Sequence, residues 1–200
     1  MLELRKKYKS GSAAEILCEA ILTGDIPEGI SITQNEIADS LGTSRMPVRE
    51  ALISLEYQGL IVRHTNQHVQ TASLNDEAIH SIFNDMAVLE IEALRHMTRE
   101  KIIMLTQCEG QINFHRMICE FTESPLRKKM LETFTEVYFE FVIERSENAA
   151  QIEAVFVDLQ KAMNGHTDIE VLRACYAVYA EVLASELIRI RCIHSKGEYE

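Results

Sequence analysis

Proline and glycine are scarce in this chain, since its 200 residues include only 3 Pro and 8 Gly. Both residue types mark turns and loops, so their scarcity argues against a loop-rich protein and predicts a mainly α-helical one. No run of 18 apolar residues occurs, and no apolar stretch follows the basic residues near the start. We therefore expect a soluble, cytoplasmic protein with no signal peptide or membrane span. With 46% hydrophobic residues it can still bury a sizeable core.

Cysteines are few, odd in number and widely spaced, and none forms a C-x-x-C pair. This excludes a zinc knuckle and a disulfide framework. We predict that the five thiols act as small buried hydrophobic groups. They are Cys18, Cys108, Cys119, Cys175 and Cys192.

Positive charge is also in deficit, because the formal net charge is −11. Residues 1–73 hold 7 Lys and Arg against 9 Asp and Glu, and residues 74–200 hold 13 against 22. The acid thus lies mostly in the second part, but the first part is not basic. Any contact with nucleic acid must therefore depend on correctly placed charges rather than on a general positive field.

Signatures of catalysis are missing as well. The chain shows no Ser/His/Asp, Cys/His or phosphate-loop pattern. A metalloenzyme built on a helical bundle would need paired Glu-x-x-His segments, and no such pair is present. We therefore expect that the protein is not an enzyme.

Two helices with clear start signals follow the amino terminus. Capping boxes at Ser12 with Glu15 and at Thr33 with Glu36 predict where they begin. A short alternating run between them predicts one small strand. Gly42 is suited to end the second helix, because glycine readily adopts the left-handed conformation.

A third helix follows almost at once, with Ser44 as its N-cap. Arg45 and Arg49 lie one turn apart and face solvent, and Val48, Ala51, Leu52 and Leu55 face the core. Two strands come next, residues 60–62 and 68–71, around a turn that suits Asn66. This order of elements predicts a winged helix-turn-helix, which we assign to a DNA-binding domain of residues 1–73. The basic residues at positions 5–9 are either a mobile end or an arm that contacts DNA.

The remaining residues, 74–200, are predicted to form an all-helical domain. Their amphipathic pattern gives the helices Asp76–Met97, Arg99–Phe121, Pro125–Ser146, Ala149–Asn164 and Ile169–His194. The aromatic side chains of the third of these suggest a dimer interface. They are Phe134, Tyr138, Phe139 and Phe141, with Val142 beside them.

The run IADSLGTSRMPVREALISLEYQGLIVR resembles the DNA-binding domain of the GntR family of bacterial transcriptional regulators. The helical part is similar to the effector-binding domain of the FadR-type subfamily (the FCD fold) at Phe114-His115 and at residues 123–126. The resemblance implies a homodimer that binds a short palindromic operator in double-stranded DNA, acting as a repressor. In this family, residues matching Ser44, Arg45 and Arg49 contact DNA, and the wing tip, here Thr65-Asn66, reaches the minor groove.

Two features depart from that resemblance. Asn35 replaces a basic residue that often contacts phosphate. In the helical part, FadR-type domains with a metal use an aspartate four residues before the F-H histidine and two later histidines. Here only His115 remains, with Gln111 in the aspartate position and Val157 and Tyr179 in the later ones.

With one imidazole and no carboxylate expected near it, we predict no metal cofactor. A divalent site that joins His115 to His166 or His194 is the disfavoured alternative.

Two hypotheses for the helical domain stay open. In one, it binds a small metabolite effector in an interior pocket without metal. In the other, it is a ligand-free dimerisation or protein-interaction module. The candidate pocket residues are Met86, Glu90, Gln111, His115, Tyr176 and Tyr179, and core packing is the plain alternative role for each.

Overall fold

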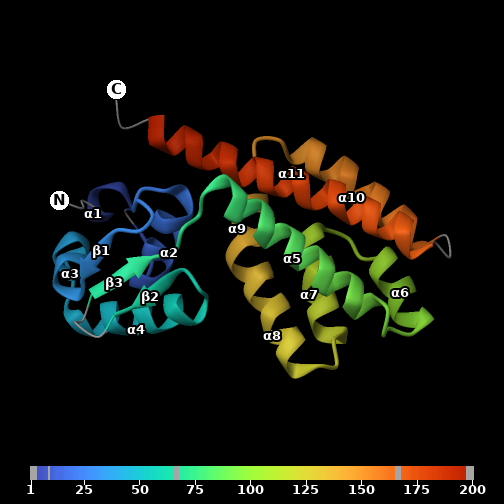
Figure 1. Ribbon diagram of the computed structural model, residues 1–200, viewed down its shortest axis with the longest axis horizontal. Helices are drawn as coiled ribbons and strands as arrows, with labels where there is room; N and C mark the ends of the chain where they lie inside the picture. The colour runs from blue at the N-terminus through green and yellow to red at the C-terminus, as the bar shows by residue number, and fades with distance from the viewer. Residues whose placement is uncertain (1–3, 9, 65–67, 165–167, 197–200) are drawn as a thin grey trace. The chain divides into compact units, whose positions relative to one another are not determined.

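The computed structural model describes residues 4–8, 10–64, 68–164 and 168–196. The chain divides into two compact units, one of residues 1–75 with 191–200 and the other of residues 76–190. Helices dominate both, and the described residues form one small three-stranded antiparallel sheet. The predicted fold class, a winged helix-turn-helix followed by an all-helical part, is confirmed (Figure 1).

Among its described residues, the first unit contains four complete helices, three strands and the end of α11 (Ile169–Lys196). Their bounds are α1 (Leu4–Lys7), α2 (Ala13–Thr23), β1 (Ser31–Thr33), α3 (Gln34–Leu41), α4 (Arg45–Tyr57), β2 (Ile61–Arg63) and β3 (His68–Thr71).

Helix starts in this unit follow the predicted capping. In both capping boxes the Ser or Thr side chain accepts from the backbone N–H three residues on, and the Glu side chain accepts in return from the capping residue. Gly42 ends α3 in the left-handed conformation with φ of 61°. Helices α3 and α4, joined by Gly42, Thr43 and Ser44, are therefore the helix-turn-helix.

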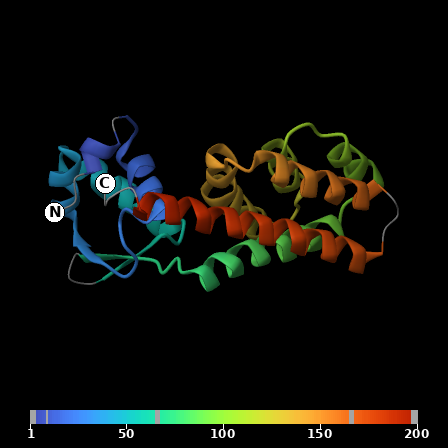
Figure 2. The ribbon, with the colours of Figure 1, turned by 90° about the horizontal axis from the view of Figure 1, so that it is seen from above.

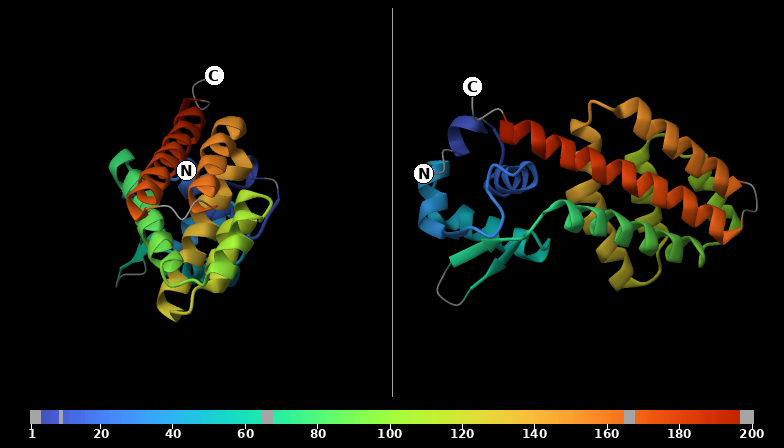
Figure 3. Two further views of the ribbon diagram at one scale, coloured as in Figure 1. Left: turned by 90° about the vertical axis from the view of Figure 1, so that its right-hand side faces the viewer. Right: turned by 45° about the horizontal axis from the view of Figure 1, so that its top comes forward.

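The sheet forms the wing, with strands in the order β1-β3-β2. Ile32 of β1 lies opposite Val69 of β3, and Val62 of β2 lies opposite Gln70. The right panel of Figure 3 shows the strands beside the helices. The turn that joins β2 to β3, with Thr65 and Asn66, lies outside the described residues.

The core of this unit is formed where α2 and α3 pack on α4. Apolar side chains fill this core and are almost fully buried. Val48, Ala51, Leu52 and Leu55 lie there as predicted, and Leu17, Leu22, Ile37 and Leu60 pack with them.

Both ends of the chain add contacts to this core. The ammonium of Lys7 lies 2.6 Å from the carboxylate of Asp25, and the buried Tyr8 hydroxyl also donates to Asp25. Leu4–Lys7 thus form a short helix anchored through Lys7 and Tyr8, which contradicts the prediction of a mobile end for these residues. Contact of this segment with DNA stays a prediction. Arg191 belongs to this unit too, and its Nη1 donates to the carbonyl oxygens of Ile21 and Leu22 at 2.9 and 2.8 Å.

The second unit is helical throughout its described residues. Its elements are α5 (Asp76–Leu94), α6 (Arg99–Thr106), α7 (Gln111–Phe121), α8 (Pro125–Thr133), the π-helical stretch η1 (Phe134–Phe139), α9 (Glu140–Arg145), α10 (Ala149–Asn164) and α11 (Ile169–Lys196), whose last residues belong to the first unit. The helices form a bundle, seen end-on in the left panel of Figure 3, and α5 runs beside α11 in Figure 2.

Two predicted helices differ from those observed. The single helix predicted for Arg99–Phe121 is two helices, because Gly110 adopts φ of 83° and starts α7 afresh after α6 has ended. The helix predicted for Pro125–Ser146 continues through η1 into α9. Most of its predicted interface side chains belong to the core, since Phe139 and Val142 are fully buried and Tyr138 and Phe141 nearly so, while Phe134 is half-buried.

The cysteines differ in how far they are buried. All five thiols are free, and only Cys119 is buried, while Cys192 is exposed and the others lie between. The prediction of five buried thiols is therefore wrong for four of them. Among the described helices, none combines the length and the apolar character needed to cross a membrane.

Candidate DNA-binding face and buried polar cluster

The amino end of α4 is open to solvent. Ser44 is its N-cap in an extended conformation, and its hydroxyl makes no capping hydrogen bond. No acidic side chain lies in the first turn. The first N–H groups of the helix, with the positive end of its dipole, are therefore available to an anion such as a phosphate.

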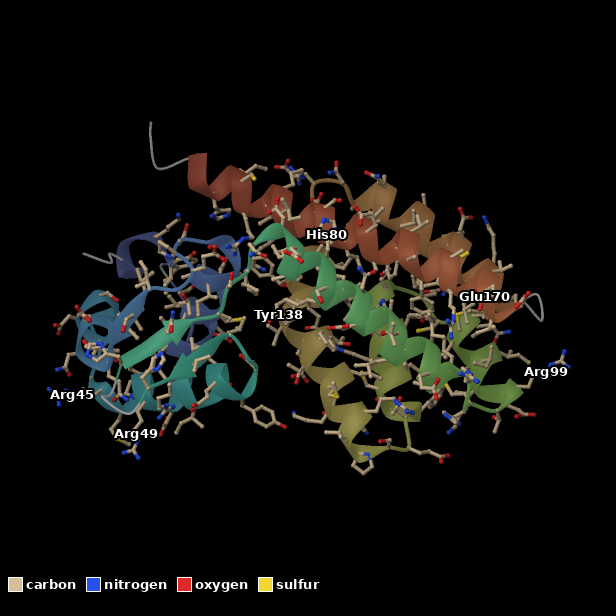
Figure 4. All side chains as sticks on the ribbon, in the orientation of Figure 1. Arg45, Arg49, His80, Arg99, Tyr138 and Glu170 are labelled. Atoms are coloured by element: carbon tan, nitrogen blue, oxygen red, sulfur yellow. The ribbon has the colours of Figure 1, made fainter. Side chains whose placement is uncertain are left out.

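Arg45 and Arg49 extend the same end of the helix. Both are exposed, and in Figure 4 both side chains point away from the body of their unit. Within the described part of the chain, neither guanidinium makes an ion pair or a hydrogen bond. Two unpaired guanidinium groups one turn apart can form bidentate hydrogen bonds to base edges or phosphates.

The surroundings of this face carry little further positive charge. Arg63 of β2 is paired with Glu56 of α4, 3.1 Å away. Asn35, at the start of α3, is exposed and uncharged. His64 and Gln70 of the wing are joined by a hydrogen bond of 3.0 Å. The candidate DNA-binding face therefore consists of Ser44, Arg45 and Arg49, with no broad basic patch around them.

In the second unit, the six candidate pocket residues are all buried. Four of them form one chain of hydrogen bonds across α5, α7 and α11, which we call the buried polar cluster. Glu90 Oε1 lies 2.5 Å from His115 Nδ1, His115 Nε2 lies 3.2 Å from the Tyr179 hydroxyl, and that hydroxyl donates to Gln111 Oε1 at 2.8 Å. The structure thus brings together Glu90, Gln111, His115 and Tyr179.

The bond between Gln111 and Glu153 decides which atoms donate and which accept in the cluster. Gln111 Nε2 donates to Glu153 at 2.8 Å, so Gln111 Oε1 is left to accept from Tyr179. The Tyr179 oxygen must then accept from an N–H at His115 Nε2. One further proton is shared between His115 Nδ1 and Glu90. Sequence analysis did not identify Glu153, because nothing in the pattern links it to a residue 42 positions away.

Two other buried polar atoms lie at or beside the cluster. The Tyr176 hydroxyl and Glu90 Oε2 make no hydrogen bond of good geometry with any described residue, but the Tyr176 hydroxyl lies close enough to the Glu90 carboxyl to interact with it. Burial, and then the charge of Glu90, raises the pKa of Tyr176 and Tyr179 well above the ordinary tyrosine value. Both hydroxyls therefore remain protonated at neutral pH.

The residues around His115 do not fit a divalent metal. Both ring nitrogens are occupied, Nδ1 by Glu90 and Nε2 by Tyr179. The described residues contain no group of three His, Cys, Asp or Glu side chains arranged to hold a metal ion. The expectation that no carboxylate lies near His115 was wrong, because Glu90 contacts it. This carboxylate is hydrogen-bonded to His115 Nδ1, so that nitrogen is not free to bind a metal ion.

Other candidate ligands lie elsewhere or outside the described residues. His194 belongs to the first unit, 3.9 Å from Asp25, and His166 is outside the described residues. A single Glu-x-x-His segment, Glu77 to His80, lies near the start of α5. Its histidine Nδ1 lies 3.0 Å from the carboxylate of Glu181.

A surface cavity of about 730 Å³ lies beside the cluster, at the amino ends of α7 and α10. Gln111 lines it, together with its partner Glu153. Of the six candidate pocket residues, Gln111 is the one that lines this cavity.

Comparison with known proteins agrees with the first unit's geometry. Residues 9–69 match the family model of the bacterial regulatory proteins of the gntR family. This segment is therefore similar to a GntR-family domain. It is 44% identical over 55 residues to an uncharacterized HTH-type transcriptional regulator of Mycobacterium tuberculosis, a match that covers 28% of this chain and 22% of that protein. The chain therefore matches under a quarter of the length of this relative.

Longer matches are weaker in identity. The gluconate operon transcriptional repressor of Bacillus licheniformis is 22% identical over 196 residues, covering 94% of this chain and 78% of that protein. Lar, which controls the expression of the Listeria monocytogenes agr system, matches in structure with a TM-score of 0.59 and 16% identity, over 88% of this chain and 95% of the other. E. coli McbR/YncC matches with a TM-score of 0.54 and 16% identity, over 94% and 99%. Because both structures are only 16% identical in sequence, they support the fold and no shared function.

Proposed function

We propose that the protein is a transcriptional regulator that binds a short palindromic operator as a homodimer and represses the genes beside it. The observation that carries this proposal is the pair Arg45 and Arg49, exposed and unpaired at the open end of α4 in a segment similar to a GntR-family domain. The long match to a protein named as an operon repressor supports repression rather than activation.

Readout of the operator rests on the two arginines. A guanidinium can bond guanine O6 and N7 together, which is worth about 1–3 kcal/mol of discrimination against another base. Ser44 and the first N–H groups of α4 hold a phosphate and set the register. Thr65 and Asn66 at the wing tip enter the minor groove. Because the first part of the chain is not basic, one copy binds weakly, and two copies on an inverted repeat supply the affinity.

For the helical unit we propose a FadR-type effector-binding and dimerisation domain that works without a metal. The buried polar cluster supports an effector-binding role. An effector that bonded Gln111 or Tyr179 would rearrange all the linked hydrogen bonds, and so would change the contacts among α5, α7 and α11. The alternative, a ligand-free dimerisation or protein-interaction module, is favoured by the same cluster's complete internal pairing of His115.

Selection of duplexes from a random DNA pool tests the DNA-binding proposal. We expect enrichment of an inverted repeat, with two chains per duplex by light scattering. Arg49→Ala should lose specific binding while its far-ultraviolet circular dichroism stays that of the wild type. Arg99→Ala, an exposed arginine of the helical unit, is the matched control and should bind as the wild type does. Failure to enrich any sequence contradicts the proposal.

A thermal-shift panel separates the two roles of the helical unit. Small carboxylates and apolar metabolites are tested on the wild type and on Tyr179→Phe. A stabilising compound that loses its effect in the variant, and that changes operator affinity, supports an effector domain. No response across the panel, with dimerisation intact, supports the ligand-free module. Elemental analysis should find well under one metal ion per chain.

A further inference from the structure

Met46 lies in the middle of the candidate DNA-binding face. It follows Arg45 directly and is 60% exposed, although methionine is usually a buried residue. Met46, Arg49 and Ile53 succeed one another at helical spacings of three and four, so they share one face of α4. A large apolar side chain thus stands beside two arginines where the helix meets solvent.

The position of Met46 on the helix decides what it would contact in a complex. Recognition helices of this type place their amino-terminal residues against base edges in the major groove. Met46 is the second residue of α4, within its first turn. A methionine side chain has no hydrogen-bond donor and only a weak acceptor, so it cannot read the polar pattern of a base pair.

One apolar group is displayed on the major-groove edges of the four bases, namely the C5-methyl of thymine. We propose that Met46 is a specificity-determining residue that reads a thymine methyl beside the guanines read by Arg45 and Arg49. This inference rests on the proposed function. It adds a preference for thymine in each half-site that hydrogen bonds from the arginines do not provide.

The experiment removes that methyl alone. In the duplex enriched from the random pool, each thymine is replaced in turn by deoxyuridine, which pairs identically but lacks the methyl. Dissociation constants are measured by fluorescence anisotropy at one fixed salt concentration. Burial of a single methyl corresponds to about a fourfold change in an equilibrium constant. We therefore expect about a fourfold loss of wild-type affinity at one thymine of each half-site.

Met46→Ala identifies the side chain responsible. This variant should bind the thymine and deoxyuridine duplexes equally, because it has no apolar group to contact the methyl. Any effect of deoxyuridine on DNA flexibility would persist in the variant and so is separated from a direct contact. Ile53→Ala is the matched control, an equally exposed aliphatic residue on the same face about 10 Å further along the helix, and it should keep the wild-type difference.

The outcomes separate the inference from the function on which it rests. Wild-type binding that ignores every deoxyuridine, a half-site without thymine, or a Met46→Ala variant as sensitive as the wild type each overturns the Met46 assignment and leaves DNA binding standing. Loss of the difference in Ile53→Ala as well as Met46→Ala also overturns it. Failure to enrich any duplex overturns both.

Discussion

Glu90 and His115 form a fully buried pair in the helical unit, with the carboxylate Oε1 2.5 Å from the imidazole Nδ1. They come from α5 and α7, which are 25 positions apart at these residues. The pair occupies the position where the FadR-type resemblance led us to consider a metal. The Nδ1 atom of His115, which a metal site would need free or bound to the ion, is instead hydrogen-bonded to Glu90.

Removing one member of this pair should destabilise the protein strongly. Glu90→Leu leaves the imidazole of His115 buried without its partner, and we expect a loss of about 3 kcal/mol in the free energy of unfolding. Urea titration measures it. Glu92→Leu, on the same helix but in an exposed pair with Arg95 and His96, should cost much less, because water screens that pair. The double variant Glu90→Leu/His115→Leu should recover part of the loss, and no recovery would argue against pairing as the cause.

The two buried tyrosines of α11 offer a matched comparison. Tyr179→Phe removes a hydroxyl that joins His115 to Gln111, so we expect a loss of about 1–3 kcal/mol. Tyr176→Phe removes a buried hydroxyl that interacts with Glu90 only outside good hydrogen-bond geometry, so we expect a smaller loss than for Tyr179→Phe. Urea unfolding of both variants tests the difference, and equal losses would show that the hydrogen bonds of Tyr179 contribute little.

Acid should weaken the helical unit through Glu186. Its hydrogen bond with Arg189, with further bonds from Asn148 and Ser146, lowers the pKa of this carboxyl from 4.5 to about 2. A lowered folded-state pKa stabilises the protein above the unfolded-state value, and this contribution disappears as pH falls toward about 2. The stability difference between wild type and Glu186→Gln should be constant near neutral pH and shrink below pH 4.5. Glu170→Gln, a change at an exposed position near the start of the same helix, is the control.

The hydrogen bonds from Arg191 should stabilise the carboxyl end of α2. Arg191→Ala leaves the carbonyls of Ile21 and Leu22 without this donor, and we expect about 2 kcal/mol less protection of the α2 amides. Hydrogen exchange detected by mass spectrometry measures it, with the α7 amides as an internal reference. The exposed neighbour change Ile193→Ala should leave both helices unchanged. Unaltered protection of the α2 amides in Arg191→Ala would mean that water bonds the two carbonyls as well as the guanidinium does.

Shape as well as charge should matter at Arg45. Arg45→Lys keeps the positive charge but loses the planar fork that bonds guanine at two points. We expect about 1–3 kcal/mol less discrimination between the enriched duplex and one with the guanine replaced, at a similar dependence on salt. Anisotropy titrations at several salt concentrations test both effects. Arg116→Lys, in the helical unit and paired with Glu140, is the control. Full discrimination by Arg45→Lys would assign this arginine to phosphate contact.

Local patterns were read correctly from the sequence wherever the determining residues are neighbours in the chain. The capping boxes at Ser12 and Thr33 and the left-handed Gly42 depend on contacts within a few residues, so the helix-turn-helix could be predicted closely. The break before Gly110 was missed because α6 and α7 together continue an acceptable helical pattern. Only the backbone conformation of Gly110 shows that the chain turns there.

Contacts between distant residues could not be predicted in the same way. The sequence placed Glu90, Gln111 and His115 near one another only through a family resemblance, and it did not indicate that they bond to each other. Nor did it show that the aromatic residues of 125–146 face inward, since an apolar helix face looks the same whether it packs within a chain or against a second one.

The ten residues from Arg191 onward have a consequence for anyone who would recombine this protein with others. Regulators with new sensing properties are commonly built by joining one protein's DNA-binding segment to another's sensor at a single junction. A cut after Asn75 would leave the α2 carbonyls without the guanidinium that bonds them, because Arg191 lies 170 positions after Ile21 in the chain. A working exchange needs two junctions, with the final turns of α11 retained from the same parent as α2.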